Sequence, residues 1–223
     1  MEEPSKYGVI VCAPGSSHIE RFVEKPTEFV SNRINAGIYI FNPKILNRIK
    51  PEPTSIEKEV FPFMARDGEL HSMDLEGFWM DVGQPKDYLV GIGLYLGSIA
   101  AKNDGSLPRG DNIIGNVLID PSARIGKNCK IGPNVTIGPN VIIEDGVRVS
   151  KAAILEGARL KSHSYVSNSI IGWHASVGSW SRVEGGSVLG DDVGVNDELY
   201  VNGATVLPNK TIGSNITTPQ IIM

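Results

Sequence analysis

Cysteine is scarce in this chain, and its scarcity excludes a disulfide-based scaffold. Only two of the 223 residues are cysteines, Cys12 and Cys129. They lie far apart in the sequence and match no metal-ligand or redox spacing. We therefore interpret them as two ordinary buried thiols of a protein in a reducing compartment.

An excess of positive charge is also absent. Lys and Arg total 21 against 25 Asp and Glu, which gives a net charge of -4. Such a chain has no basic field with which to displace counterions from a polyanion. We therefore expect no nucleic acid among its partners.

Long hydrophobic runs are missing as well. The longest apolar stretch, residues 88–101, carries three glycines and is shorter than the roughly 20 residues needed to cross a bilayer. The first residues, MEEPSKYG, lack the basic-then-apolar order of a signal peptide. We expect no membrane partner and a cytoplasmic location.

The C-terminal half carries a repeat of six residues. Branched aliphatic residues recur in one frame as Ile113, Ile119, Ile125, Ile131, Ile137, Ile143, Val149 and Leu155. The frame slips over residues 156–170 and resumes as Ile171, Val177, Val183, Leu189, Val195, Val201 and Leu207. A period of six fits neither a helix nor simple strand alternation, and it is typical of a solenoid in which each aliphatic side chain points to a common axis.

This repeat resembles the hexapeptide repeat of left-handed parallel β-helices. The resemblance implies that three hexapeptides form one triangular turn, so that residues 113–212 form about five turns. At ~4.8 Å per paired strand, the prism is roughly 25 Å long. Its ends need covering because their strand edges are unpaired. Residues 219–223 either cap one end or leave it for a second subunit.

The N-terminal half alternates strand and helix patterns. Strands are predicted over residues 7–11, 19–24, 34–41 and 78–82 from their β-branched and aromatic content. One helix starts at Asn42, and a second starts near Thr54, with Glu57 at capping-box spacing, and stops at Gly68. A third helix spans residues 85–102, with Tyr88, Ile92, Tyr95 and Ile99 on its apolar stripe. A polar linker marks a domain boundary near residue 105.

Four strings place polar groups at predicted strand ends. They are Lys6-Tyr7-Gly8-Val9, Phe22-Val23-Glu24-Lys25-Pro26, Asn35-Ala36-Gly37-Ile38-Tyr39 and Trp79-Met80-Asp81-Val82-Gly83. Ligands of α/β domains gather where strands end. A carboxylate, a lysine and an amide at such a place serve sugar hydroxyls, a phosphate and a metal, although composition alone does not say which.

The four strings, in this order and followed by the hexapeptide repeat, resemble the sugar-nucleotide pyrophosphorylases over the whole length of the chain. In detail they resemble the mannose-1-phosphate guanylyltransferases, also called GDP-mannose pyrophosphorylases, of the catalytic beta type. The resemblance implies an α/β plus β fold: a partial Rossmann-like nucleotidyltransferase domain over residues 1–104 and a left-handed parallel β-helix over residues 105–223. It also implies attack of mannose-1-phosphate on GTP, assisted by Mg²⁺, to give GDP-mannose and pyrophosphate.

The same resemblance assigns roles to five residues. Lys25 holds the sugar phosphate and Asp81 binds Mg²⁺, and these two are the implied catalytic residues. Gly8, Glu24 and Asn35 are implied sugar contacts. Three of them have a plainer alternative: a solvated surface lysine at Lys25, a turn amide at Asn35, and a cap or salt-bridge partner at Asp81.

Glu24 and Lys25 can serve one ligand only under a geometric condition. Adjacent residues of a regular strand point to opposite faces. Both side chains therefore reach the same ligand only if Pro26 interrupts the strand at this point.

The resemblance places the GTP-binding part of the family before Lys6, where this sequence has only five residues. We expect that the chain alone neither holds GTP nor turns over, and that GTP is a partner only together with the missing N-terminal half. The sequence is then either part of a longer enzyme or a short form that acts through partners. A homo-oligomer, or a hetero-oligomer with a paralogous regulatory subunit, is expected.

Two other functions remain open. Hexapeptide β-helices often carry acyltransferase activity with a catalytic histidine, and His163 and His174 are candidates, although neither has an obvious acid partner in the sequence. Binding of acyl-CoA would identify this activity. Alternatively, the chain is a non-catalytic assembly or regulatory subunit that acts through its β-helix.

Overall fold

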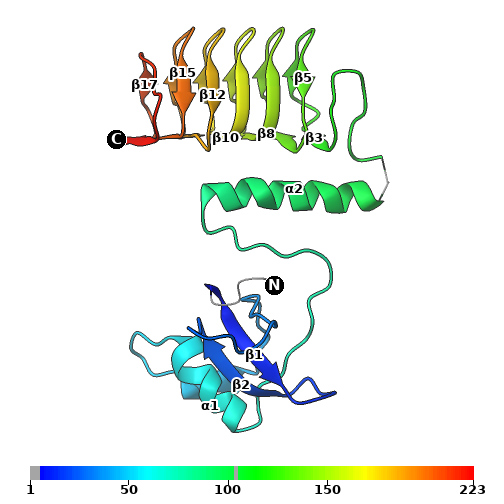
Figure 1. Cartoon of the computed structure of the whole chain (residues 1–223), viewed down its shortest axis with the longest axis vertical. Coiled ribbons are helices and arrows are strands. Elements are labelled where there is room, and N and C mark those ends of the chain that lie inside the picture. Colours follow the sequence, from blue (N-terminus) through cyan, green and yellow to red (C-terminus); the bar gives the residue numbers. More distant parts are fainter. Residues whose placement is uncertain (1–5, 103–104) are drawn as a thin grey trace. The chain divides into compact units, whose positions relative to one another are not determined.

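The computed structural model describes residues 6–102 and 105–223. The chain divides into two compact units, Met1–Trp79 and Met80–Met223. Figure 1 shows the elements of each unit. The second unit contains both the long helix α2 (Pro85–Lys102) and the solenoid. The domain boundary at residues 104 and 105 stays a prediction.

The first unit is built on an antiparallel hairpin of β1 (Gly8–Cys12) and β2 (Ile19–Glu24). The 3-10 helix η2 (Pro43–Arg48) follows, and Asn42 caps it as the sequence predicts. A π-helical turn η3 (Ile56–Val60) leads into α1 (Phe61–Arg66). Side chains from these elements form one small core: Ile10, Ile19, Phe22, Val60, Phe61, Met64, Ala65 and Leu70.

Two predicted strands of this unit are wrong. Residues 34–41 contribute only the isolated bridge between Val9 and Ile34, and residues 78–82 form no strand. A turn interrupts the first segment, because the Asn35 side chain accepts a hydrogen bond from the Gly37 N–H and Gly37 adopts a φ of 73°. Beyond that turn these β-branched residues have no ladder partner among the described residues.

The start of the second predicted helix is also corrected. Ser55, not Thr54, is the cap: its hydroxyl accepts from the Lys58 N–H, and Glu59 rather than Glu57 accepts from the Ser55 N–H. The widened π turn before α1 places Pro62 in the first turn of a new helix, where its missing N–H costs nothing. Gly68 ends the helix in a left-handed conformation, as predicted.

The second unit is a parallel β-solenoid, consistent with the left-handed β-helix that the repeat predicts (Figure 1). One wall is a six-stranded sheet, so the solenoid has about six turns instead of five. Its strands are β4 (Arg124–Ile125), β7 (Ile142–Ile143), β9 (Arg159–Leu160), β11 (Ser176–Val177), β14 (Gly194–Val195) and β17 (Thr211–Ile212).

The other two walls share a ten-stranded sheet, because two strands run around a corner. These two are β8 (Arg148–Ile154) and β10 (Tyr165–Ile171). The remaining strands are β3 (Val117–Ile119), β5 (Lys130–Ile131), β6 (Val135–Ile137), β12 (Arg182–Glu184), β13 (Val188–Leu189), β15 (Tyr200–Asn202), β16 (Ala204–Val206) and β18 (Gln220–Ile222).

The repeat correctly predicts most of the residues that point into the solenoid core, but two of its predictions are wrong. Ile154, not Leu155, and Val206, not Leu207, fill the core, at 1% and 2% exposure. Where β8 turns the corner, only five positions separate the inward residues Val149 and Ile154. The segment 156–170 therefore continues the solenoid, and its core residues are fully buried: Ala158, Leu160 and Val166.

The solenoid corners use left-handed backbone conformations. Many of them carry asparagine, such as Asn128 and Asn134, which tolerates positive φ better than most residues. One corner column stacks Gly146, His163 and Trp180: a Cβ on Gly146 would lie 2.3 Å from His163 Nδ1, and the His163 and Trp180 rings stack at 4.3 Å. His163 at this corner therefore requires a glycine at position 146, whereas Trp180 stacks on the His163 ring.

Helix α2 lies along one wall of the solenoid (Figure 1). Ile92 and the fully buried Leu96 pack with Ala153, while the predicted stripe residues Tyr88 and Tyr95 are 40% and 49% exposed. A Cβ on Gly93 would lie 3.4 Å from the Asn134 amide, so this glycine permits a close approach. No described helix is long and apolar enough to span a membrane.

The C-terminal tail is the last rung of the solenoid. Strand β18 pairs in parallel with β16; its central residue Ile221 is 66% exposed, and Met223, which follows the strand, is 83% exposed. The tail thus extends the sheet and leaves its own outer edge without a strand partner among the described residues.

The two isoleucines of β7 test the core assignment. Ile143 points inward at 1% exposure and Ile142 outward at 37%. We expect Ile143→Ala to lower the free energy of unfolding of the solenoid by about 2 to 5 kcal/mol, because it leaves a cavity. The matched control Ile142→Ala should cost under about 1 kcal/mol. Urea unfolding followed by the fluorescence of the two solenoid tryptophans checks both, and equal effects would contradict the assignment.

Candidate active site

Three of the predicted sugar contacts converge in the first unit. Gly8 and Glu24 are directly opposite in the β1–β2 ladder, and the Asn35 N–H donates to the Gly8 carbonyl at 2.7 Å. A Cβ placed on Gly8 would lie 2.7 Å from Glu24 Oε2 and 3.3 Å from Asn35 Cβ. The missing side chain of Gly8 therefore leaves the space in which the Glu24 carboxylate and the Asn35 side chain lie beside the strand.

Lys25 meets the geometric condition set by the sequence. Strand β2 ends at Glu24, and Lys25 takes a left-handed φ of 46° before the buried Pro26. This conformation is rare for a residue with a side chain and is disfavoured further before proline. The alternation of side chains along the strand therefore ends before Lys25. The exposed Lys25 side chain is no longer constrained to the strand face opposite to that of Glu24.

The Asn35 amide is engaged on both sides. Its oxygen accepts from the Gly37 N–H, and its nitrogen donates to the Tyr39 hydroxyl, which in turn donates to Glu57 Oε1 at 3.3 Å. Burial raises the pKa of the Tyr39 phenol. Asn35 thus stabilises a turn, as its plainer alternative predicts. Its role as a sugar contact stays a prediction.

Sequence reasoning missed the partners of this network. Tyr39 and Trp79 were predicted only as strand residues, and Glu57 was predicted only as part of a helix cap. The Trp79 indole donates to the Ala36 carbonyl at 3.0 Å and packs edge-on against Tyr7. No pattern in the sequence indicates the contacts of Trp79 or the bond between Tyr39 and Glu57, because these join residues from separate segments.

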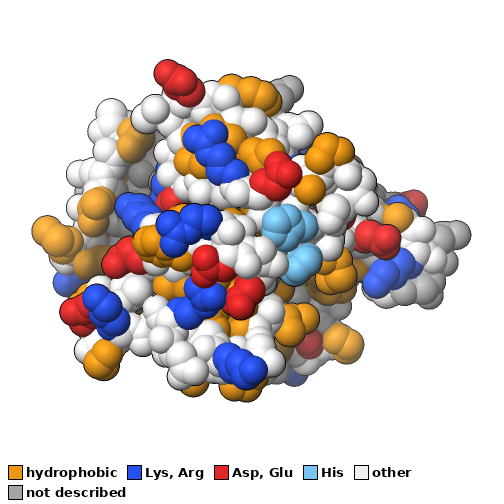
Figure 2. Space-filling model, turned by 90° about the horizontal axis from the view of Figure 1, so that it is seen from below, with side chains coloured by type: hydrophobic (Ala, Val, Ile, Leu, Met, Phe, Trp, Pro, Cys, Tyr) orange, Lys and Arg blue, Asp and Glu red, His pale blue; other side chains and the backbone are white. Residues whose placement is uncertain are grey.

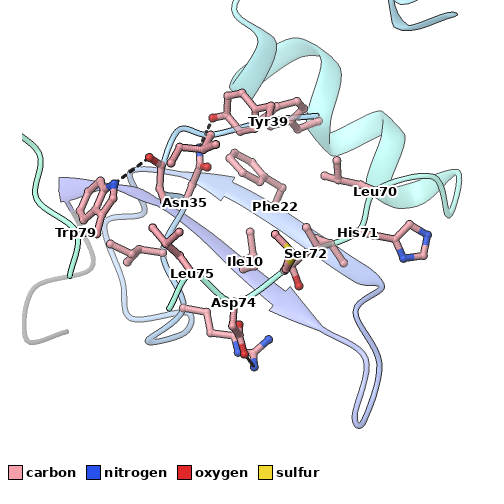
Figure 3. Close-up of a pocket in the computed structure, with 17 residues that line it drawn as sticks. Ile10, Phe22, Asn35, Tyr39, Leu70, His71, Ser72, Asp74, Leu75 and Trp79 are labelled. Carbon is pink, nitrogen blue, oxygen red and sulfur yellow. Dashed lines mark hydrogen bonds and ion pairs between the residues drawn. The ribbon is translucent and has the colours of Figure 1, made fainter. Parts of the chain in front are cut away.

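A hollow of about 390 Å³ opens beside this cluster (Figure 3). Asn35, Tyr39 and Trp79 lie along its rim, and its floor is apolar, with Ile10 and Phe22 pointing into it. It shares Asn35 with the predicted site but is not lined by Gly8, Glu24 or Lys25. Other apolar residues at the hollow are open to solvent: Ile38 at 69%, Met73 at 87% and Leu75 at 51% exposure.

A second polar group lies at the far end of the β1–β2 hairpin. The rings of His18 and His71 are 5.6 Å apart. Figure 2 shows a face of the molecule on which acidic, basic and histidine side chains are intermixed. Arg33 pairs with Asp74 and donates to the half-buried Cys12 thiol. Cys12 is therefore less buried than predicted, whereas the other thiol, in the solenoid core, is fully buried.

Asp81 is exposed and lies in the second unit. No hydrogen bond or ion pair within residues 6–102 and 105–223 engages its carboxylate, so the cap or salt-bridge alternative finds no support. In the same ranges no three His, Cys, Asp or Glu side chains cluster to hold a metal. An accessible single carboxylate fits Mg²⁺, which keeps several waters and takes few protein ligands. Its role as a metal ligand stays a prediction.

The two histidines of the acyltransferase hypothesis lie at solenoid corners. His163 stacks on Trp180, whereas His174 Nδ1 lies 3.1 Å from Asp191 Oδ1. The expectation that neither has an acid partner is therefore wrong for His174. Both side chains of this pair are more than half exposed, so the contact is a surface ion pair of small energetic value.

Comparison with known proteins covers nearly the whole chain. The nucleotidyl transferase family model matches residues 1–96, and the model described as the GMPPB C-terminal domain matches residues 113–222. The mannose-1-phosphate guanyltransferase of Schizosaccharomyces pombe is 65% identical over 225 residues. The mannose-1-phosphate guanylyltransferase catalytic subunit beta of Danio rerio is 59% identical over 223 residues. Each match covers 100% of this chain and 62% of the relative.

A solved structure, the acetyltransferase domain of PglB from Neisseria gonorrhoeae, covers 63% of this chain and 70% of its own. Its TM-score of 0.30 at 17% identity supports no argument about function.

The fold and the matched regions define the class of this protein. It is a nucleotidyltransferase-type chain in which a nucleotidyl transferase domain precedes a parallel β-solenoid. Within that class, the chain is similar over its whole length to the mannose-1-phosphate guanyltransferases. It spans about 62% of the length of these relatives.

Tyrosine titration tests the Tyr39 network. Burial raises the pKa of Tyr39, and the hydrogen bond to Glu184 raises that of Tyr200, so two of the six tyrosines should ionise above pH 10. The neutral Tyr39 phenol stabilises the first unit below pH 10, and this contribution is lost as the pH rises through its raised pKa. In Tyr39→Phe, tyrosinate absorbance should show only one late group. Two late groups would contradict the network.

Proposed function

We propose that the whole protein of which this sequence is a part forms GDP-mannose and pyrophosphate from mannose-1-phosphate and GTP. One observation supports this most: Gly8, Glu24 and Asn35 converge in the region matched by the nucleotidyl transferase model, and β2 breaks at Lys25 beside them. The names of the relatives supply the substrate class. Such a reaction requires no residue to form a covalent bond with the substrate.

The residues of this chain act by holding the sugar phosphate. A phosphate oxygen of mannose-1-phosphate attacks the α-phosphorus of GTP, the new P–O bond forms, and the bond to the β-phosphate oxygen breaks to release pyrophosphate. The Lys25 ammonium offsets the repulsion between the two anions as they approach. Glu24 accepts hydrogen bonds from sugar hydroxyls, and Gly8, which has no side chain, leaves the room that the Glu24 carboxylate occupies.

Asp81 is the proposed ligand of Mg²⁺, which supplies neutralisation of the nucleotide phosphates when bound. Its carboxylate is exposed and unpaired within the described residues, so it is available to a hydrated cation.

The part that holds GTP is proposed to lie in the portion of the relatives that this chain does not cover. Two features support this. The chain matches 62% of each relative, and the first unit has a two-stranded sheet beside an open apolar hollow. Two strands rarely suffice for an independently stable sheet. The chain alone is therefore proposed to be inactive. The whole protein is proposed to work in the cytoplasm.

Adding the uncovered portion tests this requirement. We expect the chain alone to release no pyrophosphate from GTP and mannose-1-phosphate. Fused to the part of the Schizosaccharomyces pombe relative that it does not match, it should turn over. Turnover by the chain alone would contradict the proposed requirement. A correctly folded but inactive fusion would favour the non-catalytic assembly or regulatory subunit.

Lys25→Ala in that active fusion tests the phosphate contact. Loss of a charge-assisted hydrogen bond should lower kcat/KM for mannose-1-phosphate by roughly 10- to 100-fold. The KM for GTP should change little, because Lys25 is assigned to the sugar side. Lys50→Ala is the matched control, since Lys50 is 80% exposed and pairs only weakly with Glu52 at 3.8 Å. Equal effects of the two substitutions would refute the assignment.

A further inference from the structure

Two of the four histidines of the chain face each other on the first unit. His18, directly before β2, and His71, in the segment after α1, form an isolated antiparallel bridge. Backbone hydrogen bonds of their sequence neighbours flank it: Ile19 N–H to the Leu70 carbonyl at 2.9 Å, and Ser72 N–H to the Ser17 carbonyl at 2.7 Å. Residues flanked in this way form a non-hydrogen-bonded pair, whose Cα atoms are about 4.5 Å apart and whose side chains lie on one face. The backbone therefore places the two imidazoles side by side.

The bridge between the two histidines is anchored on the core of the first unit. Ile19 and Leu70, the neighbours of the histidines, are 5% and 8% exposed and belong to the same core cluster. On the other side of the bridge, the His18 carbonyl accepts a hydrogen bond from the Ala13 N–H at 3.0 Å. The backbone beneath the rings is therefore fixed before any ligand arrives, and such preorganisation lowers the cost of binding.

The spacing of the two rings is close to that of two ligands of one metal ion. The ring centres of His18 and His71 lie 5.6 Å apart, with 63° between the ring planes. Two imidazoles that bind one tetrahedral ion, each through a nitrogen at about 2.1 Å, have ring centres roughly 5 Å apart. A small rotation of the two side chains closes this difference without any movement of the backbone.

Ring nitrogens of both histidines are available to a ligand. His71 Nδ1 lies 3.2 Å from the Ser17 hydroxyl, and when Nδ1–H donates to this oxygen, Nε2 keeps a free lone pair. Metal-bound histidines are oriented in this way, through a hydrogen bond from their other ring nitrogen. Neither ring nitrogen of His18 has a hydrogen-bond partner within residues 6–102 and 105–223. His71 is exposed, and its ring points away from the apolar hollow in Figure 3.

The donor atoms select the class of cation. Imidazole nitrogen suits Zn²⁺, Ni²⁺ and Cu²⁺, whereas Mg²⁺ prefers oxygen ligands. No third His, Cys, Asp or Glu side chain joins the two histidines to form a larger cluster in the part of the chain that the structure describes. The other coordination positions are therefore left to water, so the ion is held less tightly than in a closed site with four protein ligands.

We propose that His18 and His71 form a binding site for one divalent transition-metal ion. The bound ion connects the β1–β2 hairpin to the segment that follows α1. It stabilises the first unit, because the folded bridge binds it more tightly than the two separated imidazoles of the unfolded chain do. The site includes none of the residues assigned to the proposed reaction, and it differs in chemistry from the Asp81 carboxylate, which is the proposed ligand of Mg²⁺.

Zn²⁺ binding to the full chain tests the site. Isothermal titration calorimetry with ZnCl₂, in a buffer that does not bind metal and without nucleotide or sugar phosphate, should show one ion per chain. Cu²⁺ should bind more tightly than Zn²⁺, and excess Mg²⁺ should not compete. Zn²⁺ should also raise the midpoint of thermal unfolding of the first unit.

Three substitutions should weaken Zn²⁺ binding. Ser17→Ala removes only the oxygen that orients the His71 ring, and it should weaken binding about tenfold. His18→Asn and His71→Asn each remove a ligand, so each should weaken binding by more than Ser17→Ala does. Circular dichroism of each variant confirms that it is folded.

The other two histidines of the chain provide matched controls. His163→Asn and His174→Asn remove imidazoles at solenoid corners, where both residues have a positive φ that asparagine tolerates. Cys12→Ser removes the half-buried thiol of the first unit, which is a second type of metal ligand. All three variants should bind Zn²⁺ as the unmodified chain does.

Nitrogen-15 spectra of the four imidazoles identify the ligands without any substitution. Zn²⁺ should shift the ring signals of His18 and His71 and should leave those of His163 and His174 in place.

Three results would overturn the proposal. Zn²⁺ could leave the His18 and His71 signals unshifted, or His18→Asn and His71→Asn could bind it no more weakly than the solenoid controls do. Amide spectra could also show that the bridge between the two histidines is not formed in the chain, and the site requires that bridge. None of these results depends on turnover, so a failure of this proposal is distinguishable from a failure of the proposed reaction.

Discussion

The stacking of inward aliphatic side chains from successive turns is the interaction on which the second unit depends. Each turn pairs only with its neighbours, so no turn buries its own apolar residues by itself. Fully buried residues such as Ile131, Leu160 and Val183 form one continuous core. To keep that core in register, the chain must bend three times per turn. The left-handed corner residues make this bend, and their stacking fixes which residues fit there.

The first unit depends on a much smaller set of contacts. Phe61 is its largest fully buried side chain and contacts the rings of Phe22, Tyr39 and Phe41. Phe22 also stands beside Gly8, so the same aromatic group that supports the helix α1 shapes the candidate sugar site. The position of the Glu24 carboxylate is therefore tied to a small core, whereas the solenoid spreads its stability over many equivalent turns.

The sequence was sufficient to predict core residues where the structure repeats, and it was insufficient where the structure does not repeat. The period of six predicts inward residues such as Ile125 and Val195, because each position is supported by others in the same frame. It missed the one-residue contraction at the corner of β8, since Leu155 and Ile154 are equally aliphatic.

The same limit applies to the candidate site. The quoted strings located Gly8, Glu24 and Lys25, and the break before Pro26 followed from proline chemistry. The hydrogen bonds from Trp79 to Ala36 and from Tyr39 to Glu57 join segments far apart in sequence, which no local pattern reveals. The unit boundary at Trp79 sets one further limit on the chemistry: only Met80 separates this residue, bonded to Ala36, from Asp81. Two extended residues reach at most about 7 Å, so the Cα atom of the metal-ligand candidate stays within this distance of the Trp79 Cα atom whatever the arrangement of the two units.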